Sequence, residues 1–102
     1  MKSTVFEKLI NNGFEWFGEL VNCDQIFIKK LPSQRLDKQI RLQISLGDEY
    51  SCIITSHVRE PEHERDYICR NVLYDSTIEN LINRILEDIE YFLIDLKRKY
   101  PV

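Results

Sequence analysis

The clearest pattern along the chain is a largely regular alternation of apolar and polar residues between positions 39 and 58, which is the period of a half-buried β-strand. Its apolar residues at even positions are Ile40, Leu42, Ile44, Leu46, Tyr50, Cys52, Ile54 and Val58. Directly opposed residues of an antiparallel pair share one face of the sheet, so even positions must oppose even positions. The pattern therefore predicts a β-hairpin with a connection of three residues, which places Leu46 opposite Tyr50, or of five.

Three other short segments have the composition of strands and are bordered by turn-forming residues. They cover residues 14–20, 25–31 and 67–74. Before the first of them, Thr4 and Glu7 fit a helix capping box, and Gly13 can adopt the left-handed conformation that ends a helix. We therefore expect a short helix near Thr4 to Asn12.

The last quarter of the chain carries the strongest helix signal. Ser76 and Glu79 fit a second capping box, and Pro101 cannot continue a helix. Between them, apolar residues recur at alternating intervals of four and three, namely Ile78, Ile82, Ile85, Ile89, Phe92 and Leu96. This periodicity predicts about 23 residues of amphipathic helix, ~34 Å long, which is enough to cross a five-stranded sheet.

The order of the predicted elements is helix, five strands, helix. The segments between the strands are too short for the crossovers that parallel strands require. We expect one α+β domain over residues 1–102, with a short N-terminal helix, an antiparallel meander of about five strands, and a long C-terminal helix packed on one sheet face.

If even positions face the helices, they form an almost continuous apolar core. The expected members are Phe14, Trp16, Leu20, Ile26, Ile28, Ile40, Leu42, Ile44, Leu46, Cys52, Ile54, Ile68 and Val72. Apolar residues at odd positions, such as Phe17, Phe27 and Ile53, would then face outward, unless a bulge at Gly18 shifts the first strand. Tyr91 and Ile94 fall on the side of the long helix opposite its apolar stripe. Apolar groups on two outer surfaces favour a partner protein or self-association.

Composition is that of an ordinary globular protein, with 43% hydrophobic and 30% charged residues and a net charge of −3. The three cysteines are an odd number and the N-terminal stretch lacks a secretory signal, so we expect a reducing, cytoplasmic location. The longest apolar run, YFLI at 91–94, is too short to cross a membrane. Alanine is absent and isoleucine frequent, which is typical of AT-rich coding sequences such as those of low-GC bacteria and their phages.

Four residues in the middle of the chain are of types that bind zinc, namely Cys52, His57, His63 and Cys69. The gaps between them are four, five and five residues, whereas paired zinc ligands are usually two to four residues apart, so we predict no metal site. No sequence signature connects a cysteine to either histidine for nucleophilic catalysis, and Glu60 and Glu62 lie in a charged loop unsuited to acid-base catalysis. We expect neither enzymatic activity nor a cofactor.

A basic stretch runs from Lys29 to Arg41, and its cations could follow a phosphate backbone. They are Lys29, Lys30, Arg35, Lys38 and Arg41. The order of elements is similar to that of the double-stranded RNA-binding domain, but that family grips phosphates with basic residues at the start of its last helix, whereas this helix opens with DSTIEN. Nucleic-acid binding is therefore the first alternative function, and a small-molecule or metal-binding domain is the second.

The prediction that these patterns favour is a small non-catalytic protein-binding module, of the inhibitor, immunity or phage and mobile-element modulator type. It depends on the small size, the missing catalytic motifs and the leftover apolar residues. The expected apolar anchors are Phe17, Phe27, Ile53, Tyr91 and Ile94, and the expected charged rim is Glu60, Glu62, His63, Glu64 and Arg65. The partner is another protein, with a homodimer as an alternative, and no membrane is expected.

Overall fold

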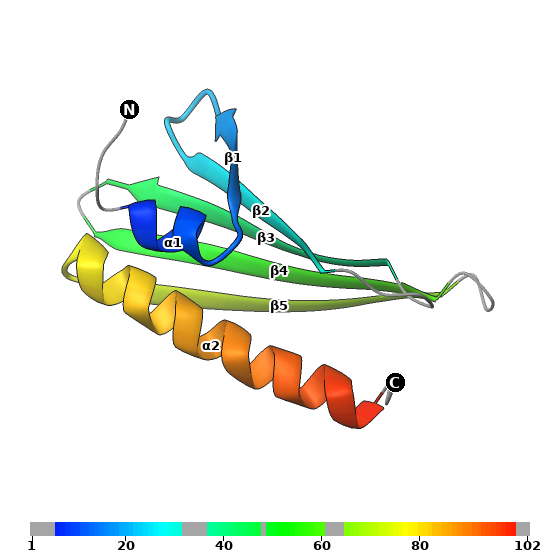
Figure 1. Cartoon of the computed structure of the whole chain (residues 1–102). Helices are drawn as coiled ribbons and strands as arrows, with labels where there is room; N and C mark the ends of the chain where they lie inside the picture. Colours follow the sequence, from blue (N-terminus) through cyan, green and yellow to red (C-terminus); the bar gives the residue numbers. More distant parts are fainter. Residues whose placement is uncertain (1–5, 32–36, 48, 61–64, 100–102) are drawn as a thin grey trace.

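The computed structural model describes residues 6–31, 37–47, 49–60 and 65–99, with the backbone alone described at 31, 37–38, 57–60, 65–69, 96–97 and 99. Helix α1 (Glu7–Asn11) precedes strands β1 (Glu15–Glu19), β2 (Gln25–Leu31), β3 (Asp37–Leu46), β4 (Tyr50–Glu60) and β5 (Arg65–Asp75), and helix α2 (Ile78–Lys99) follows them. The strands form one antiparallel sheet in the order β1-β2-β3-β4-β5, and both helices lie on one of its faces (Figure 1). The predicted α+β fold with its antiparallel meander is confirmed.

The β3–β4 hairpin has the shorter of the two predicted connections. Leu46 lies opposite Tyr50, so three residues connect the strands. The even positions from 40 to 46 and from 50 to 56 face the helices, and five of these side chains are no more than 2% exposed, namely Ile40, Leu42, Ile44, Cys52 and Ile54. Helix α2 covers them with Leu81, Ile82, Ile85 and Ile89.

The predicted orientation of β2 is wrong. Phe27 lies opposite Leu42, so the odd positions of β2 share a face with the even positions of β3. Phe27 is 1% exposed, and its ring centroid lies 5.1 Å from that of Phe6 beside α1. Ile26 and Ile28 therefore point to the other face of the sheet. Because three consecutive residues are apolar, the strand shows no alternation from which its faces could be assigned.

The orientation of β5 is reversed in the same way. Leu73 lies opposite Cys52 and packs against the core, whereas Val72, a predicted core residue, lies opposite Ile53 and is 40% exposed. Trp16, Leu20 and Leu46 were also expected in the core, but they are exposed near the ends of their strands. The side chain of Ile68 lies outside the described part of the chain.

The first strand contains the bulge that the sequence offered as an alternative. The β1–β2 register shifts between Trp16 and Gly18, and Gly18 has a φ of +119°, a conformation that favours glycine. Phe17, the extra residue of the bulge, is exposed. The indole N–H of Trp16 donates to Oε1 of Gln25 at 2.9 Å, which fixes this exposed side chain against the neighbouring strand.

Helix α2 begins differently from the predicted Ser76–Glu79 capping box. Thr77 is the N-cap, since its Oγ1 accepts a hydrogen bond from the N–H of Asn80 at 3.2 Å. The Asp75 carboxylate accepts another from the N–H of Ser76 at 2.8 Å. At α1, Thr4 lies outside the described residues, and the predicted stop at Gly13 is confirmed by its φ of +91°.

Candidate functional site

The candidate site is the outer face of the sheet, defined as the face that points away from α1 and α2 (Figure 1). Cross-strand pairing places its residues in rows that run across β2, β3, β4 and β5. The central row contains Ile26, Gln43, Ile53 and Val72, and the next contains Ile28, Arg41, Thr55 and Arg70. A third, shorter row contains Ser45, Ser51 and Tyr74. Of the apolar residues on this face, Ile26 is buried, Ile28 and Ile53 are half-buried, and Val72 and Tyr74 are exposed, with Arg41 and Arg70 beside them.

Hydrogen bonds hold the polar side chains of the outer face in place. Nε2 of Gln43 donates to Oδ2 of Asp24 at 2.8 Å, and Nδ2 of Asn22 donates to the same oxygen at 3.1 Å. Nη1 of Arg41 donates to Oε1 of Gln43 at 3.4 Å. Arg41 is therefore tied through Gln43 to the buried Asp24, which reduces the entropy it would lose on binding a partner.

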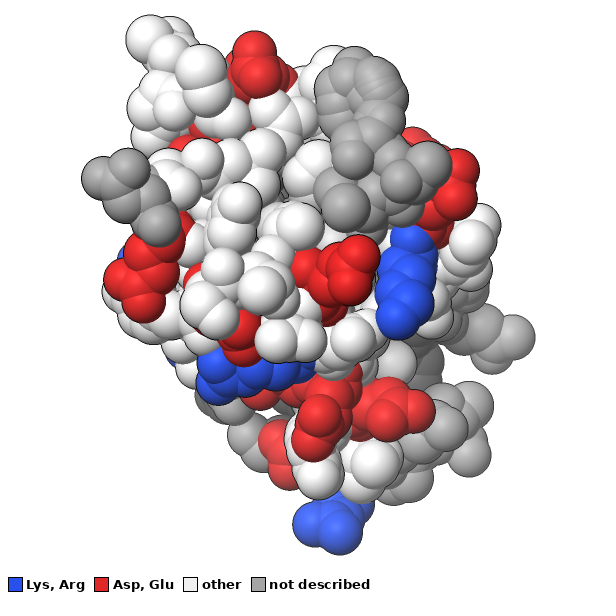
Figure 2. Space-filling model, turned by 90° about the vertical axis from the view of Figure 1, so that its left-hand side faces the viewer, with Lys and Arg blue, Asp and Glu red and all other residues white. Residues whose placement is uncertain are grey.

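Among the described side chains, the outer face carries more cations than carboxylates, and α2 more acids than cations. Lys30, Arg41 and Arg70 lie on the outer face, together with Glu15, opposite Ile28, and the Asp24 carboxylate that accepts from Gln43. The described side chains of α2 instead include the exposed acids Glu79, Glu87, Glu90 and Asp95. Figure 2 shows the end of the molecule lying at the left of Figure 1, where acidic side chains are spread widely and the basic ones form separate patches.

The predicted apolar anchors do not form one surface. Ile53 lies at the centre of the outer face, and Phe17 is exposed at the bulge of β1. Tyr91 and Ile94 are exposed on α2, on the opposite side of the molecule. The expectation that Phe27 faces outward is wrong, because its ring is part of the core. The side chains of Glu60, Glu62, His63, Glu64 and Arg65 lie outside the described part of the chain.

The predicted basic stretch is divided between the two faces of the sheet. Lys30 and Arg41 lie on the outer face, whereas Lys29 lies on the helix side, where its Nζ is 5.8 Å from the centroid of the Phe14 ring. Arg35 and the side chain of Lys38 lie outside the described residues. The analysis of the sequence did not select Arg70 and Tyr74, because their faces depend on the register of β5.

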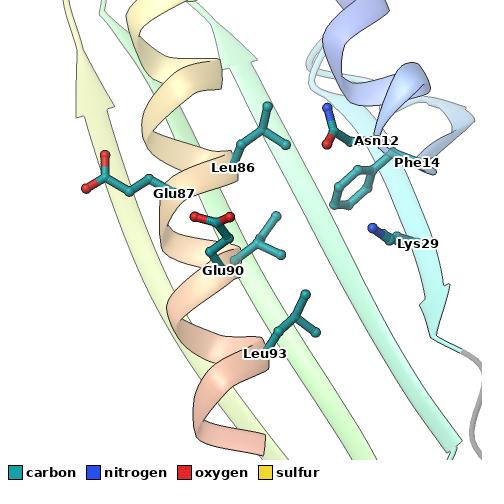
Figure 3. A pocket seen from close by; sticks show the side chains of 8 residues that line it. Asn12, Phe14, Lys29, Leu86, Glu87, Glu90 and Leu93 are labelled. Carbon is teal, nitrogen blue, oxygen red and sulfur yellow. The ribbon is translucent and has the colours of Figure 1, made fainter. Parts of the chain in front are cut away.

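A shallow groove lies between α2 and the start of the β1–β2 hairpin, with a volume of about 300 Å³ (Figure 3). The side chains that line it are Asn12, Phe14, Lys29, Leu86, Glu87, Ile89, Glu90 and Leu93. Lys29 lies across the groove from α2, where the Glu87 carboxylate points away from it, so the groove combines the Lys29 cation with Glu90 beside an apolar floor. This groove is a candidate location for a bound small molecule, the second alternative function.

The two cysteines with described side chains are in different surroundings. Cys52 is buried, and burial raises the pKa of its thiol to about 12, which makes it a poor nucleophile at neutral pH. Cys23 is exposed in the β1–β2 turn. Among the described residues, no group of three or more His, Cys, Asp or Glu side chains could hold a metal ion.

Comparison with known proteins gives no family assignment. No family model matches the chain, and neither curated proteins nor solved structures gave a significant match. No helix in the described part of the chain is both long and apolar enough to cross a membrane.

Proposed function

We propose that the chain is a small non-catalytic protein-binding module, of the inhibitor, immunity or phage and mobile-element modulator type, and that it occupies an acidic surface of its partner. The observation that supports this most directly is the outer face of the sheet, where Ile53, Val72 and Tyr74 lie beside Arg41 and Arg70. Aliphatic and aromatic anchors with adjacent arginines are the composition of binding hot spots. Arg41 and Arg70 would steer and orient a partner that presents carboxylates.

The same proposal places the protein in the cytoplasm of a low-GC bacterium or of a cell infected by its phage. Free thiols at Cys23 and Cys52 support a reducing compartment. The absence of alanine and the abundance of isoleucine support an AT-rich coding sequence. A second copy of the chain is also a candidate partner.

Quantitative affinity capture from the lysate of the source organism tests this function. We expect Ile53→Ala together with Tyr74→Ala, or Arg41→Ala together with Arg70→Ala, to weaken capture of the specific partner by about 2 kcal/mol or more, which is roughly thirtyfold. Ile10→Ala is the control, because it removes an exposed apolar side chain from α1, outside both the outer face and the exposed side of α2. Equal recovery of the same proteins by all variants, with their melting temperatures unchanged, would contradict the proposal.

The second candidate is a nucleic-acid-binding domain, which is favoured by the placement of Lys30, Arg41 and Arg70 on one open sheet face. Three phosphate contacts predict a slope of about −2.7 for log affinity against log salt on duplex DNA, and Arg41→Ala should reduce its magnitude by about 0.9. Fluorescence anisotropy with labelled single-stranded and duplex 20-mers measures this slope. No binding to either at low salt eliminates this candidate.

A further inference from the structure

The exposed side of α2 carries four residues in a single stripe, Glu87, Tyr91, Ile94 and Arg98. They are separated by four, three and four positions, the spacing that keeps side chains on one face of a helix. Tyr91 is 66% exposed and Ile94 51%, and Glu87 and Arg98 are exposed as well. The buried residues Ile82, Ile85 and Ile89 lie on the other side of the helix, so the sheet cannot cover this stripe.

Two copies of the stripe are complementary when their helices run antiparallel. An antiparallel second helix, related by a two-fold axis between Phe92 and Leu93, places Tyr91 against Ile94 and Glu87 against Arg98, each pair occurring twice. Within one helix Glu87 and Arg98 are eleven positions apart, ~16 Å along the axis, so this pair can form only between two chains. A parallel arrangement would instead place each charge against its own copy.

In the described part of the chain, Arg84 and Asp88, charged neighbours of the stripe on α2, are directed away from it. Arg84, the cation three positions before Glu87, donates to the carbonyl oxygen of Tyr74, and its Nη1 lies 3.6 Å from Oδ2 of Asp75. Asp88 accepts a hydrogen bond from Nδ2 of Asn71 on β5 at 2.9 Å and is thereby directed toward the sheet. The intervals of four and three are also those that let side chains of paired helices interdigitate.

We infer that this stripe is a homodimer seam, in which the α2 helices of two copies pack antiparallel through Tyr91 and Ile94 and are set in register by Glu87 and Arg98. This inference goes beyond the proposed function, because it assigns a second surface and its occupant. The outer face of the sheet lies on the other side of each copy and stays free for a partner. Four residues from each copy bury much less than the ~800 Å² per partner of a stable interface, and Glu90 and Asp95 flank the stripe with like charge. We therefore expect a dissociation constant in the micromolar to millimolar range.

Sedimentation equilibrium of the full chain between about 10 μM and about 1 mM tests the seam. We expect the wild type to self-associate, and Glu87→Arg or Arg98→Glu alone to weaken the dimer by about tenfold or more, because each replaces two attractions with two repulsions. The double variant Glu87→Arg with Arg98→Glu should recover most of the affinity, because opposite charges face each other again. Far-ultraviolet circular dichroism checks that each variant is folded.

Two results would overturn the inference. One is a wild type that stays monomeric up to about 1 mM, and the other is a double variant that dimerises no better than the single ones. The pair Arg41→Ala and Arg70→Ala, which tests the outer face, should self-associate like the wild type. A loss of partner capture and a loss of the dimer therefore report on different surfaces.

Discussion

At the scale of single residues, the chemistry of the cysteines depends on where each lies in the sheet. Cys52 projects from β4 toward the helices, while Cys23 occupies a surface turn with a φ of +72°. Only the thiolate reacts rapidly with disulfide reagents. Burial keeps the Cys52 thiol protonated, so accessibility and protonation both protect it.

This difference predicts two well-separated rates of reaction with Ellman's reagent at pH 8. In a Cys69→Ser variant, Cys23 should react at once, and Cys52 should react at least about a hundredfold more slowly, since a thiol with a pKa of about 12 is ionised to only about one part in ten thousand at that pH. Addition of guanidinium chloride should release the second thiol. Equal rates for both thiols in the folded protein would contradict the buried position of Cys52.

Asp75 is the other residue whose ionisation the fold changes. Partial burial would raise the pKa of its carboxyl group, but the N–H groups of Thr77 and Ser76 and the Arg84 guanidinium lower it by more, and the pKa ends below its usual value. The folded state therefore binds fewer protons at this site than the unfolded state does. The resulting stabilisation is complete above the unfolded pKa of about 3.9 and is lost as the pH falls through the lower folded value.

We accordingly expect the urea midpoint of the wild type to fall more steeply than that of Asp75→Asn between about pH 5 and pH 2. The variant should be less stable at pH 6 and should approach the wild type at the acidic end. Midpoints measured at half-unit intervals give the comparison. Parallel curves for the two proteins would show that Asp75 makes no charge-dependent contribution.

At the scale of elements, the start of α2 distinguishes two neighbouring hydroxyl residues. Oγ1 of Thr77 accepts a hydrogen bond from the N–H of Asn80, whereas the N–H of Ser76 is bonded to Asp75 before the helix begins. We expect Thr77→Ala to lower the free energy of unfolding by about 1 kcal/mol, and Ser76→Ala, its matched control, to change it by less than about 0.5 kcal/mol. Urea unfolding at pH 7 measures both. A larger loss of stability for Ser76→Ala than for Thr77→Ala would instead support Ser76 as the N-cap, as the sequence suggested.

The elements themselves could be predicted from the sequence because their signals are local. The alternation around Ile40 to Ile54 determined which residues of β3 and β4 share a face but left a connection of three or five residues open, and the four-three spacing defined α2. The sequence did not show which residues of β2 and β5 face the helices. The faces of β2 and β5 depend on their register with β3 and β4, and the run Ile26, Phe27, Ile28 carries no period of its own.

The same limitation explains how much of the candidate site could be predicted. Ile53 was correctly assigned to the outer face because it lies in the one hairpin whose parity was determined. Arg70 and Tyr74 were missed, since reversing β5 exchanges its two faces, and Phe27 was wrongly placed outside for the equivalent reason on β2. Tyr91 and Ile94, which lie on α2 and outside this site, were correctly expected to be exposed because helical position can be calculated from sequence spacing alone.

At the scale of the whole molecule, the two candidate surfaces lie on opposite sides. The sheet separates the cationic outer face from the helix layer, so a second copy on α2 does not block a partner on the sheet (Figure 1). An antiparallel dimer would display two outer faces related by its two-fold axis. A partner that is itself multivalent could then bind both at once, with an effective concentration set by the rigid spacing between them.

This arrangement predicts a melting temperature that depends on protein concentration. Because dimerisation stabilises only the folded chain, we expect the wild type to melt a few degrees higher at about 1 mM than at about 10 μM. Glu87→Arg should clearly reduce this dependence, since it places like charges at both ends of the seam. Arg41→Ala with Arg70→Ala should retain it, because the sheet face takes no part in the α2 contact. Differential scanning calorimetry at both concentrations measures the shift, and a dependence as large in Glu87→Arg as in the wild type would mean that the chains associate through a surface other than α2.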